Sequence, residues 1–349
     1  MTRVEPAARG AGQDAVPPSA GSGGVRVRRS GPAAWIGGGV LVVAVAVLAY
    51  LPYVSSRGTQ IDLVGLFSLI VLGTMWNLLA GYGGMVSIGQ QAWIGLGGYG
   101  LVYLAGTLGL DPFVSIPLAA LACGLVAWAT SYLAFRLSGG YFAIGTWVIA
   151  EVVRLLVIQV DEVGAGSGAS LTAFSGIDPQ YRIAYVYWVA LGVAVVVVLA
   201  VYLLMRSRIG LALTAIRDEP TAAGSSGVPV TRAKRLVFVL AAVGCGLAGA
   251  VIVANTLRVQ PGSIFSVDYS ATMIFIVVIG GLGTIEGPII GAVVYYLLQD
   301  GLADLGNWYL VVVGVIAIAV TLLAPKGLWG LTRGRLSVFP TGYRVGRGT

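Results

Sequence analysis

The stretch AYVYWVALGVAVVVVLAVYLLM occupies residues 184–205 and carries no charged side chain. A helix needs about 20 mostly apolar residues to cross the roughly 30 Å hydrocarbon core of a bilayer, and this run is long enough. Comparable runs recur along the chain, in which 57% of residues are hydrophobic and only 10% are charged. Soluble domains carry about 25% charged residues. The sequence therefore predicts an all-α fold, a polytopic bundle of transmembrane helices.

Ten apolar runs are candidates for membrane spans. They cover residues 33–52, 61–80, 84–107, 113–135, 140–160, 184–205, 236–255, 269–283, 287–300 and 307–324. The run at 84–107 and the pair within 269–300 are rich in glycine, which favours broken or re-entrant helices there. Eight spans plus a re-entrant pair are therefore the alternative to ten. Both counts are even, so both place the two chain ends on the same side of the membrane.

The basic residues indicate which side that is. Sixteen of the 21 lysines and arginines fall in three segments, residues 1–32, 206–235 and 326–349. Because cytoplasmic segments are enriched in Lys and Arg, all three are predicted to be cytoplasmic, with the N- and C-termini inside. The first segment is rich in Gly, Pro and Ser and is predicted to be a disordered basic tail. Residues 33–325 form the predicted transmembrane domain, and residues 326–349 form a C-terminal cytoplasmic tail.

The composition excludes several kinds of chemistry. The chain has no histidine, and its two cysteines, Cys123 and Cys245, lie inside apolar runs, so we expect neither a metal site nor a disulfide framework. A phosphate-binding loop needs a lysine followed by Ser or Thr, and neither Lys234 nor Lys326 is followed by one. We therefore expect no enzyme activity, no cofactor and no ATP hydrolysis by this chain itself.

The segment GLALTAIRDEPTAAGSSGVPVTRAKR (210–235) is a polar, basic island between two apolar runs. Asp218 and Glu219 precede Pro220, an arrangement typical of a helix start with an acidic cap and proline at the first position. Gly227 is suited to end such a helix after about one and a half turns. The pattern predicts a short helical elbow, and a plain solvated loop that obeys the charge rule is the alternative.

Five stretches of the sequence contain motifs that are similar to those of a known family. They are NLLAGYGGMVSIGQQAWIGLGGY (77–99), YFAIGTWVIAEVVRLLV (141–157), RSRIGLALTAIRDEPTAAGSSGVPVTRAKRLVFVLAAVGCGLAGA (206–250), GGLGTIEGPIIGA (280–292) and APKGLWGL (324–331). Together they resemble the permease subunits of branched-chain amino acid ABC importers, of the LivM type, over roughly residues 60–331. The resemblance implies a permease in the bacterial cell membrane that imports branched-chain amino acids or a similar small polar solute.

The resemblance also implies partners. These are a second, LivH-like permease subunit, two cytoplasmic ATP-binding subunits and an extracytoplasmic substrate-binding protein, besides the lipid bilayer; no nucleic acid is expected. In such importers a cytoplasmic loop docks into a cleft of the ATPase, and residues 206–235 match that coupling loop. The residues that the match assigns to ATPase coupling are Arg217, Asp218, Glu219, Pro220, Thr221, Ala222, Ala223, Gly224 and Gly227.

Two departures from the family pattern are visible in the sequence, and the second of them bears on the substrate. The coupling helix of the family is longer and richer in Ala, Leu and Glu, whereas GSSG at 224–227 shortens it here, since glycine costs about 1 kcal/mol in a helix. In the Gly-rich motif, Gln90 is followed by Gln91, and Trp93 stands where Phe is common. Urea, amides and other small solutes are therefore alternatives to a branched-chain amino acid.

One group of candidate substrate-pathway residues lies in the Gly-rich segment 81–100. A helix break there would free backbone groups to contact a polar solute, and amide side chains would add uncharged polar groups. The residues are Ser87, Gln90, Gln91 and Trp93. Close helix packing through the glycines is the alternative interpretation.

A second candidate is the pair Glu151 and Arg154, whose spacing places both on one helix face. A charge at mid-membrane costs about 3 kcal/mol on insertion scales, so we expect the pair to face the bundle interior. It is either a wall of the substrate pathway or a structural ion pair. If Glu151 instead bound a proton or an ion, the chain would be an ion-coupled secondary transporter that needs no ATPase subunits. A membrane protein with a purely structural role is the third class.

Overall fold

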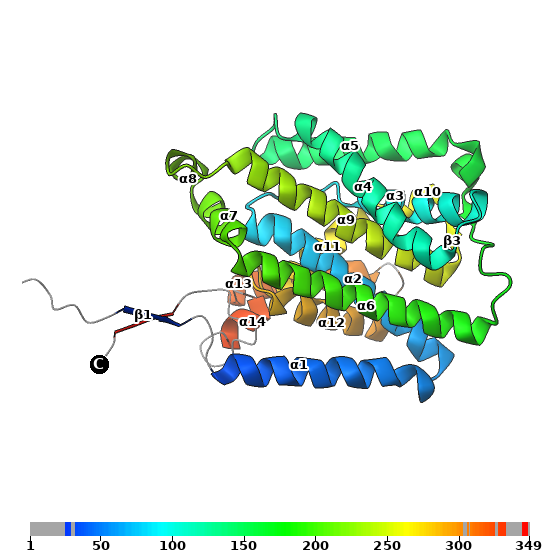
Figure 1. Cartoon of the computed structure of the whole chain (residues 1–349), viewed down its shortest axis with the longest axis horizontal. Coiled ribbons are helices and arrows are strands. Elements are labelled where there is room, and N and C mark those ends of the chain that lie inside the picture. Colours follow the sequence, from blue (N-terminus) through cyan, green and yellow to red (C-terminus); the bar gives the residue numbers. More distant parts are fainter. Residues whose placement is uncertain are drawn as a thin grey trace, which may run out of the picture.

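The computed structural model describes residues 25–28, 32–302, 306, 308–324, 327–332 and 344–347. Within these residues the fold is a helical bundle (Figure 1), so the predicted all-α class is confirmed apart from two small sheets. Most of the predicted tail at 1–32 and much of the predicted tail at 326–349 lie outside the described residues.

Each of the ten predicted apolar runs overlaps a helix in the described chain, although residues 84–90 of the run at 84–107 are not helical. These helices are α1 (Pro32–Tyr50), α2 (Arg57–Asn77), α3 (Gln91–Leu101), α4 (Pro112–Ala134), α5 (Gly140–Ile158), α6 (Pro179–Arg206), α9 (Val230–Thr256), α11 (Asp268–Gly280), α12 (Glu286–Gly301) and α13 (Trp308–Leu323). Seven stretches of the described residues are long and apolar enough to cross a membrane: Arg57–Tyr82, Pro112–Ala134, Gly140–Ile158, Pro179–Arg206, Val230–Thr256, Pro261–Gly280 and Val311–Leu331. The exact count of ten spans stays a prediction.

The other described elements are short. The short α-helices are α7 (Arg208–Asp218), α8 (Pro220–Ser225), α10 (Pro261–Ile264) and α14 (Gly327–Thr332). The single turns of 3-10 helix are η1 (Leu51–Tyr53), η4 (Asp161–Val163) and η5 (Ala165–Ser167), and the π-helical turns are η2 (Leu78–Tyr82) and η3 (Val102–Thr107). The strands pair antiparallel as β1 (Val25–Arg28) with β4 (Arg344–Arg347), and as β2 (Ala169–Ser170) with β3 (Arg258–Val259).

Two of the long helices begin at acid–proline caps that the local sequence explains. The carboxylate of Asp111 accepts a hydrogen bond from the amide of Phe113 at 2.8 Å, at the start of α4. Asp178 accepts one from the amide of Gln180 at 2.8 Å, at the start of α6. In both, proline follows the acid, where its missing N–H has no helical partner to lose. These caps fix where the two apolar runs become helices.

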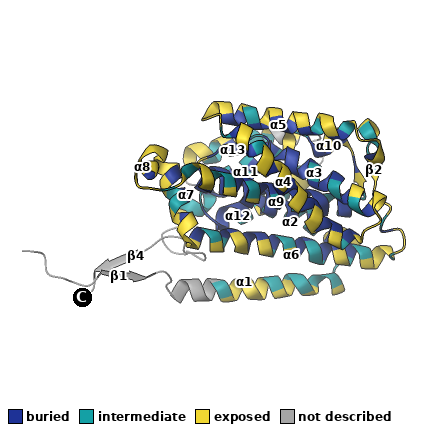
Figure 2. Ribbon diagram, turned by 45° about the horizontal axis from the view of Figure 1, so that its top comes forward, coloured by how far each residue is buried: buried dark blue, intermediate teal, exposed yellow. Residues whose placement is uncertain are grey.

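Helix α9 lies at the centre of the bundle and packs against α2, α3, α4 and α6. Figure 2 shows buried residues concentrated on inner helices such as α2, α3 and α9, and exposed residues along α5 and α6. At the α3–α9 crossing, a Cβ on Gly97 would lie 2.6 Å from the Cα of Gly246, and one on Gly249 would overlap the carbonyl oxygen of Ile94. The two backbones are therefore in direct contact, which only glycine permits at these positions.

Two breaks interrupt the Gly-rich runs, as the sequence predicted. The first break, residues 83–90, follows the π turn η2 and ends where α3 begins at Gln91. The second break, residues 281–285, separates α11 from α12, with Gly281 and Gly283 at φ values of 131° and 73°. Such values favour glycine, because a Cβ would clash with the backbone. The broken helices expected in both Gly-rich regions are therefore confirmed.

Helices α7 and α8 lie together at one end of the bundle, here termed the elbow end, and β3 with α10 lies at the opposite end (Figure 1). Arg217 of α7 contacts Gly81, and Gly81 packs on Gly283. Both breaks therefore lie at the elbow end. Strands β2 and β3 join the loop after α5 to the loop after α9 at the opposite end.

Candidate functional site

The polar residues of the first break are buried inside the chain. Ser87 and Gln90 are fully buried, and Gln91 is 1% exposed. The hydroxyl of Ser87 accepts hydrogen bonds from the amide of Gly89 at 3.3 Å and from Nε2 of Gln90 at 3.1 Å. The indole Nε1 of Trp76 donates to the carbonyl oxygen of Ser87 at 2.9 Å. These bonds satisfy the backbone where the helical ladder is interrupted.

Two hydroxyls from other helices complete this network. Oγ1 of Thr146 on α5 accepts from the amide of Ile88 at 3.3 Å. Oγ of Ser270 on α11 lies 3.0 Å from the carbonyl oxygen of Ile88 and 2.6 Å from Oε1 of Gln91. The first break is thus held by side chains far away in the sequence, a role that the spacing of residues 87–93 does not reveal.

Trp93 belongs to the packed core at the same level. It is 1% exposed, and its ring meets that of Phe238 edge-on with centroids 5.8 Å apart. The thiols of Cys123 and Cys245 lie 3.5 Å from the carbonyl oxygen of Trp93 and from Oε1 of Gln90, respectively. In this structure the four predicted pathway residues of the Gly-rich segment therefore make contacts within the chain. Contact between any of them and a solute stays a prediction.

The pair Glu151 and Arg154 lies on the outer surface of the chain. Nε of Arg154 is 3.0 Å from both carboxylate oxygens, so the predicted pairing on one helix face is confirmed. The expectation that the pair faces the interior of this bundle was wrong, because 48% of the Glu151 side chain and 28% of the Arg154 side chain are exposed. Helix α5 turns a different face inward, with Phe142, Thr146, Ile149, Ala150, Val153 and Val157 buried.

Helices α7 and α8 form the elbow that the island sequence predicted. Glu219 is the N-cap of α8, where its carboxylate accepts from the amide of Thr221 at 3.3 Å, and Pro220 follows at the first helical position. Helix α8 ends at Ser225, and Gly227 follows with a φ of 85°. The helix start and the glycine at its end are therefore confirmed as the sequence predicted them.

The elbow presents both apolar and polar groups at its surface. Ala222 of α8 is exposed, whereas Ala223 is only 4% exposed because it packs against the chain itself. On α7, Leu213 and Ile216 are buried against the bundle, while Leu211 is 58% exposed. Of the two alanines expected to contact a partner, only Ala222 is therefore available for one.

Two contacts at the elbow end could not be anticipated from the sequence. Arg217 forms an ion pair with Asp218 and also donates from Nη1 to the carbonyl oxygen of Gly81 at 3.0 Å. Asn77, 1% exposed, bonds to both Gly283 and Thr284 in the second break. No signal in the local pattern relates these residues, which are more than a hundred positions apart in the sequence.

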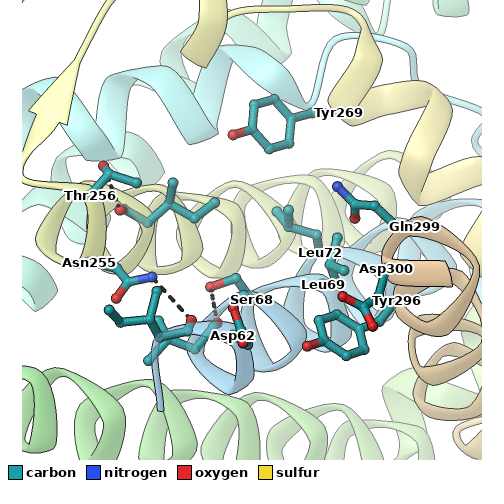
Figure 3. Close-up of a pocket in the computed structure, with 14 residues that line it drawn as sticks. Asp62, Ser68, Leu69, Leu72, Asn255, Thr256, Tyr269, Tyr296, Gln299 and Asp300 are labelled. Atoms are coloured by element: carbon teal, nitrogen blue, oxygen red, sulfur yellow. Dashed lines mark hydrogen bonds between the residues drawn. The ribbon is translucent and has the colours of Figure 1, made fainter. Parts of the chain in front are cut away.

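A cavity of about 440 Å³ lies toward the end opposite the elbow, between α2, α9, α11 and α12 (Figure 3). Leu69 and Leu72 line it together with two carboxylates, Asp62 of α2 and Asp300 of α12. Among the described residues that line it, none is basic. The acidic lining contrasts with the elbow, which is rich in arginine.

Among the described residues, no group of three or more Cys, Asp or Glu side chains is placed to hold a metal ion. A multi-pass helical bundle with unwound segments inside it and a folded elbow at one end has the architecture of a membrane permease. The chain belongs to the family described as branched-chain amino acid transport system / permease component, whose pattern matches residues 58–321. It is thus a membrane-embedded transport subunit of an ABC importer and not a catalytic subunit.

Individual relatives agree with this family. The high-affinity branched-chain amino acid transport system permease protein LivM of Salmonella typhimurium is 28% identical over 326 residues, 86% of this chain and 75% of the relative. LivM of Escherichia coli K12 is 28% identical over 327 residues, 86% of this chain and 76% of the relative. The ribose import permease protein RbsC of Escherichia coli K12 is 28% identical over 166 residues, 46% of this chain and 51% of the relative. No solved structure matches the chain.

Proposed function

We propose that this chain is one of two unlike permease subunits of an importer for branched-chain amino acids or a similar small polar solute. Two ATP-binding subunits would drive it from the cytoplasm, and an extracytoplasmic binding protein would deliver the solute. The observation that carries the proposal is the elbow, a capped two-helix unit between α6 and α9 with an exposed apolar surface. Such a unit offers a soluble partner a folded docking surface at the end of a membrane bundle.

The sidedness follows from charge. The segment 206–235, which includes the elbow and the adjoining ends of α6 and α9, contains Arg206, Arg208, Arg217, Arg232, Lys234 and Arg235, and the positive-inside rule favours the cytoplasm for so basic a segment. If all ten apolar helices cross the membrane in turn, the N- and C-termini lie on the elbow side as well. The cavity with Asp62 and Asp300 would then open toward the binding protein.

Contact with the ATPase would depend mainly on shape and apolar surface. Exposed ion pairs contribute at most about 1 kcal/mol each, so the arginines of the elbow would orient the partner more than they hold it. Ala222 on α8 and Leu211 on α7 are exposed apolar residues of the elbow. They are the contacts that a partner would bury.

The outer face of α5 favours a second permease. Glu151 and Arg154 lie half-exposed among exposed apolar residues such as Trp147 and Leu155. Charges that face lipid near the middle of a span cost about 3 kcal/mol each on insertion scales, so such a pair is expected to face protein or water. We infer that a second permease covers this face and that the solute passes between the two subunits. Whether the solute is a branched-chain amino acid, an amide or urea depends on residues from both.

The test is Ala222→Asp in the complete complex, reconstituted in vesicles with the ATP-binding subunits and the binding protein. The charge should leave the chain folded in the membrane, because Ala222 is exposed, but should weaken ATPase association and abolish stimulated uptake. Ser138→Asp is the matched control, since it adds the same charge to an exposed position at the same end of the bundle, between α4 and α5 and outside the elbow. Normal binding-protein-stimulated uptake by Ala222→Asp would refute the coupling role.

The same vesicles separate the alternatives. Uptake driven by an ion gradient in vesicles that contain this chain alone would favour a secondary transporter instead. Competition of labelled leucine uptake by valine, amides and urea would identify the class of solute. Full activity of a complex in which both permeases are copies of this chain would contradict the unlike-subunit part of the proposal.

A further inference from the structure

The end of α2 and the π turn η2, which precede the first break, are bound to the second break at the elbow end. Asn77, in the last turn of α2, donates from Nδ2 to the carbonyl oxygen of Thr284 at 2.7 Å and accepts from the amide of Gly283 at 2.8 Å. Thr284 in turn closes the second break on itself, since its hydroxyl donates to the carbonyl oxygen of Gly281 at 2.8 Å and accepts from the amide of Gly287 at 3.0 Å. The end of α2 and the turn between α11 and α12 therefore form one hydrogen-bonded unit.

The contact between turn η2 and the second break leaves no room for side chains. A Cβ on Gly81 would lie 2.7 Å from the amide nitrogen of Gly283, and it would also overlap Oδ1 of Asn77. Buried hydrogen bonds of this kind have a fixed geometry, because an unpaired amide or carbonyl inside the bundle would be costly. Turn η2 and the second break are thus expected to move together rather than slide past each other.

Arg217 joins the elbow to the same unit. Its Nη1 donates to the carbonyl oxygen of Gly81 at 3.0 Å, while Nη2 and Nε lie 3.0 and 3.1 Å from Oδ1 of Asp218. A Cβ on Gly84, which has a φ of 65°, would lie 3.2 Å from the Cα of Arg217, so the first break packs directly on α7. One guanidinium therefore contacts both the helix junction of the elbow and the end of α2.

The remaining contacts of α7 with the bundle are less directional. Leu213 and Ile216 are buried, but apolar packing tolerates small shifts in register. The guanidinium has a planar, rigid set of donors and fixes the angle between its two acceptors. Of the described contacts, the bond from Arg217 to Gly81 is therefore the one that defines how the elbow is oriented on the two breaks.

We propose that Arg217, with Asn77, forms a clasp that makes the elbow and both Gly-rich breaks one mechanical unit, so that Arg217 is a positioning residue for energy coupling. This inference rests on the proposed function, in which an ATPase moves the elbow. When the ATPase closes on ATP, the elbow carries the end of α2 and the 281–285 turn with it. The first break itself contains Ser87 and Gln90 and ends next to Gln91. Movement of the elbow would therefore reach the buried hydrogen-bond network of these three residues.

The functional test uses Arg217→Ala in the complete reconstituted complex. The Arg217 side chain is 39% exposed, but an exposed charge contributes little to association, so co-purification and basal ATPase activity should be largely retained. Stimulation of the ATPase by the loaded binding protein should fall about tenfold or more, as expected when a charged hydrogen bond is lost, and Arg217→Lys should restore only part of it. Arg136→Ala is the matched control, an exposed arginine just after α4 with no bond to either break. If the loaded binding protein stimulates the ATPase equally in the Arg217→Ala and Arg136→Ala complexes, the proposal is wrong.

A distance measurement tests the rigid unit itself, and it applies even if Arg217→Ala fails to assemble. Spin labels are placed at Ala215→Cys on α7 and Leu282→Cys in the second break, both exposed positions, in the otherwise unchanged chain, whose native cysteines are buried. The distance should be the same with and without ATP, whereas a pair at Ala215→Cys and Ser138→Cys should change. A change in the first pair, or no change in either, would contradict the proposal.

These results are distinguishable from a failure of the proposed function. If the unchanged complex shows no ATP-driven, binding-protein-dependent uptake, the importer assignment fails whatever Arg217 does. If the unchanged complex is coupled, Arg217→Ala and the spin-label distances decide the clasp.

Discussion

Replacing Gly249 with alanine should separate α3 from α9, two helices of the core whose backbones are in direct contact. A Cβ there would overlap the carbonyl oxygen of Ile94 and would lie 2.7 and 2.8 Å from the carbonyl carbon and Cα of the same residue. Real Cβ atoms essentially never approach below 3.0 Å. All three atoms belong to the backbone, so no rotation of a side chain can relieve the clash, and the helices themselves must move.

The magnitude follows from this geometry. Overpacking typically costs about 1–3 kcal/mol, and a clash with backbone belongs at the upper end. At roughly 2–4 °C per kcal/mol, Gly249→Ala should lower the melting temperature of the detergent-solubilised protein by about 6–12 °C. Because α3 carries Gln91 and continues from the first break, transport should fall with stability.

The control is Gly192→Ala on α6, where a Cβ would have no neighbour within 4 Å. Alanine is the better helix former, so this variant should melt at or slightly above the temperature of the unchanged protein. Scanning fluorimetry, with a thiol-reactive dye or intrinsic tryptophan fluorescence, measures the melting temperatures of both variants. Equal melting temperatures for Gly249→Ala and Gly192→Ala would refute the close α3–α9 contact.

Two further predictions concern the surface of the bundle. Glu151→Gln should lower the yield of folded membrane protein more than the double change Glu151→Gln with Arg154→Met, because the single change leaves one charge without a partner on an apolar face; equal yields would count against the ion pair as a structural contact. Gly227→Ala should make the elbow more open to limited proteolysis, since a φ of 85° strains alanine by about 1–2 kcal/mol. Gly262→Ala, at an open position with ordinary φ, is its control, and identical digestion of the two variants would speak against an ordered helix end at Gly227.

The sequence predicts those parts of the fold that depend on local pattern. Long apolar runs become helices because burial of the backbone in lipid requires it. The elbow is predicted for a similar reason, since Glu219, Pro220 and Gly227 act on neighbouring backbone groups only. The pairing of Glu151 with Arg154 also depends only on helical spacing.

Contacts across the bundle could not be predicted in this way. Apart from Glu151 and Arg154, helix α5 has apolar residues on every face, so its pattern does not indicate that Thr146 faces inward and Glu151 outward. The bond between Arg217 and Gly81 joins residues 136 positions apart, and a single sequence carries no record of that pairing. Ala222 and Ala223 are neighbouring residues of the same type. Only the packing of the elbow makes the first exposed and the second buried.

The network around the first break has a consequence for how the protein is made. Residues 83–90 leave the ribosome long before α5 and α11, yet their backbone groups are satisfied by Thr146 of α5 and Ser270 of α11. Lipid offers no substitute partners, so this segment cannot settle in the hydrocarbon when it first emerges. It must wait at the membrane surface or beside the insertion machinery until some 180 further residues have been synthesised. The order of translation thus imposes a late step on assembly, in which the middle of the molecule is completed after most of its outer helices are already in place.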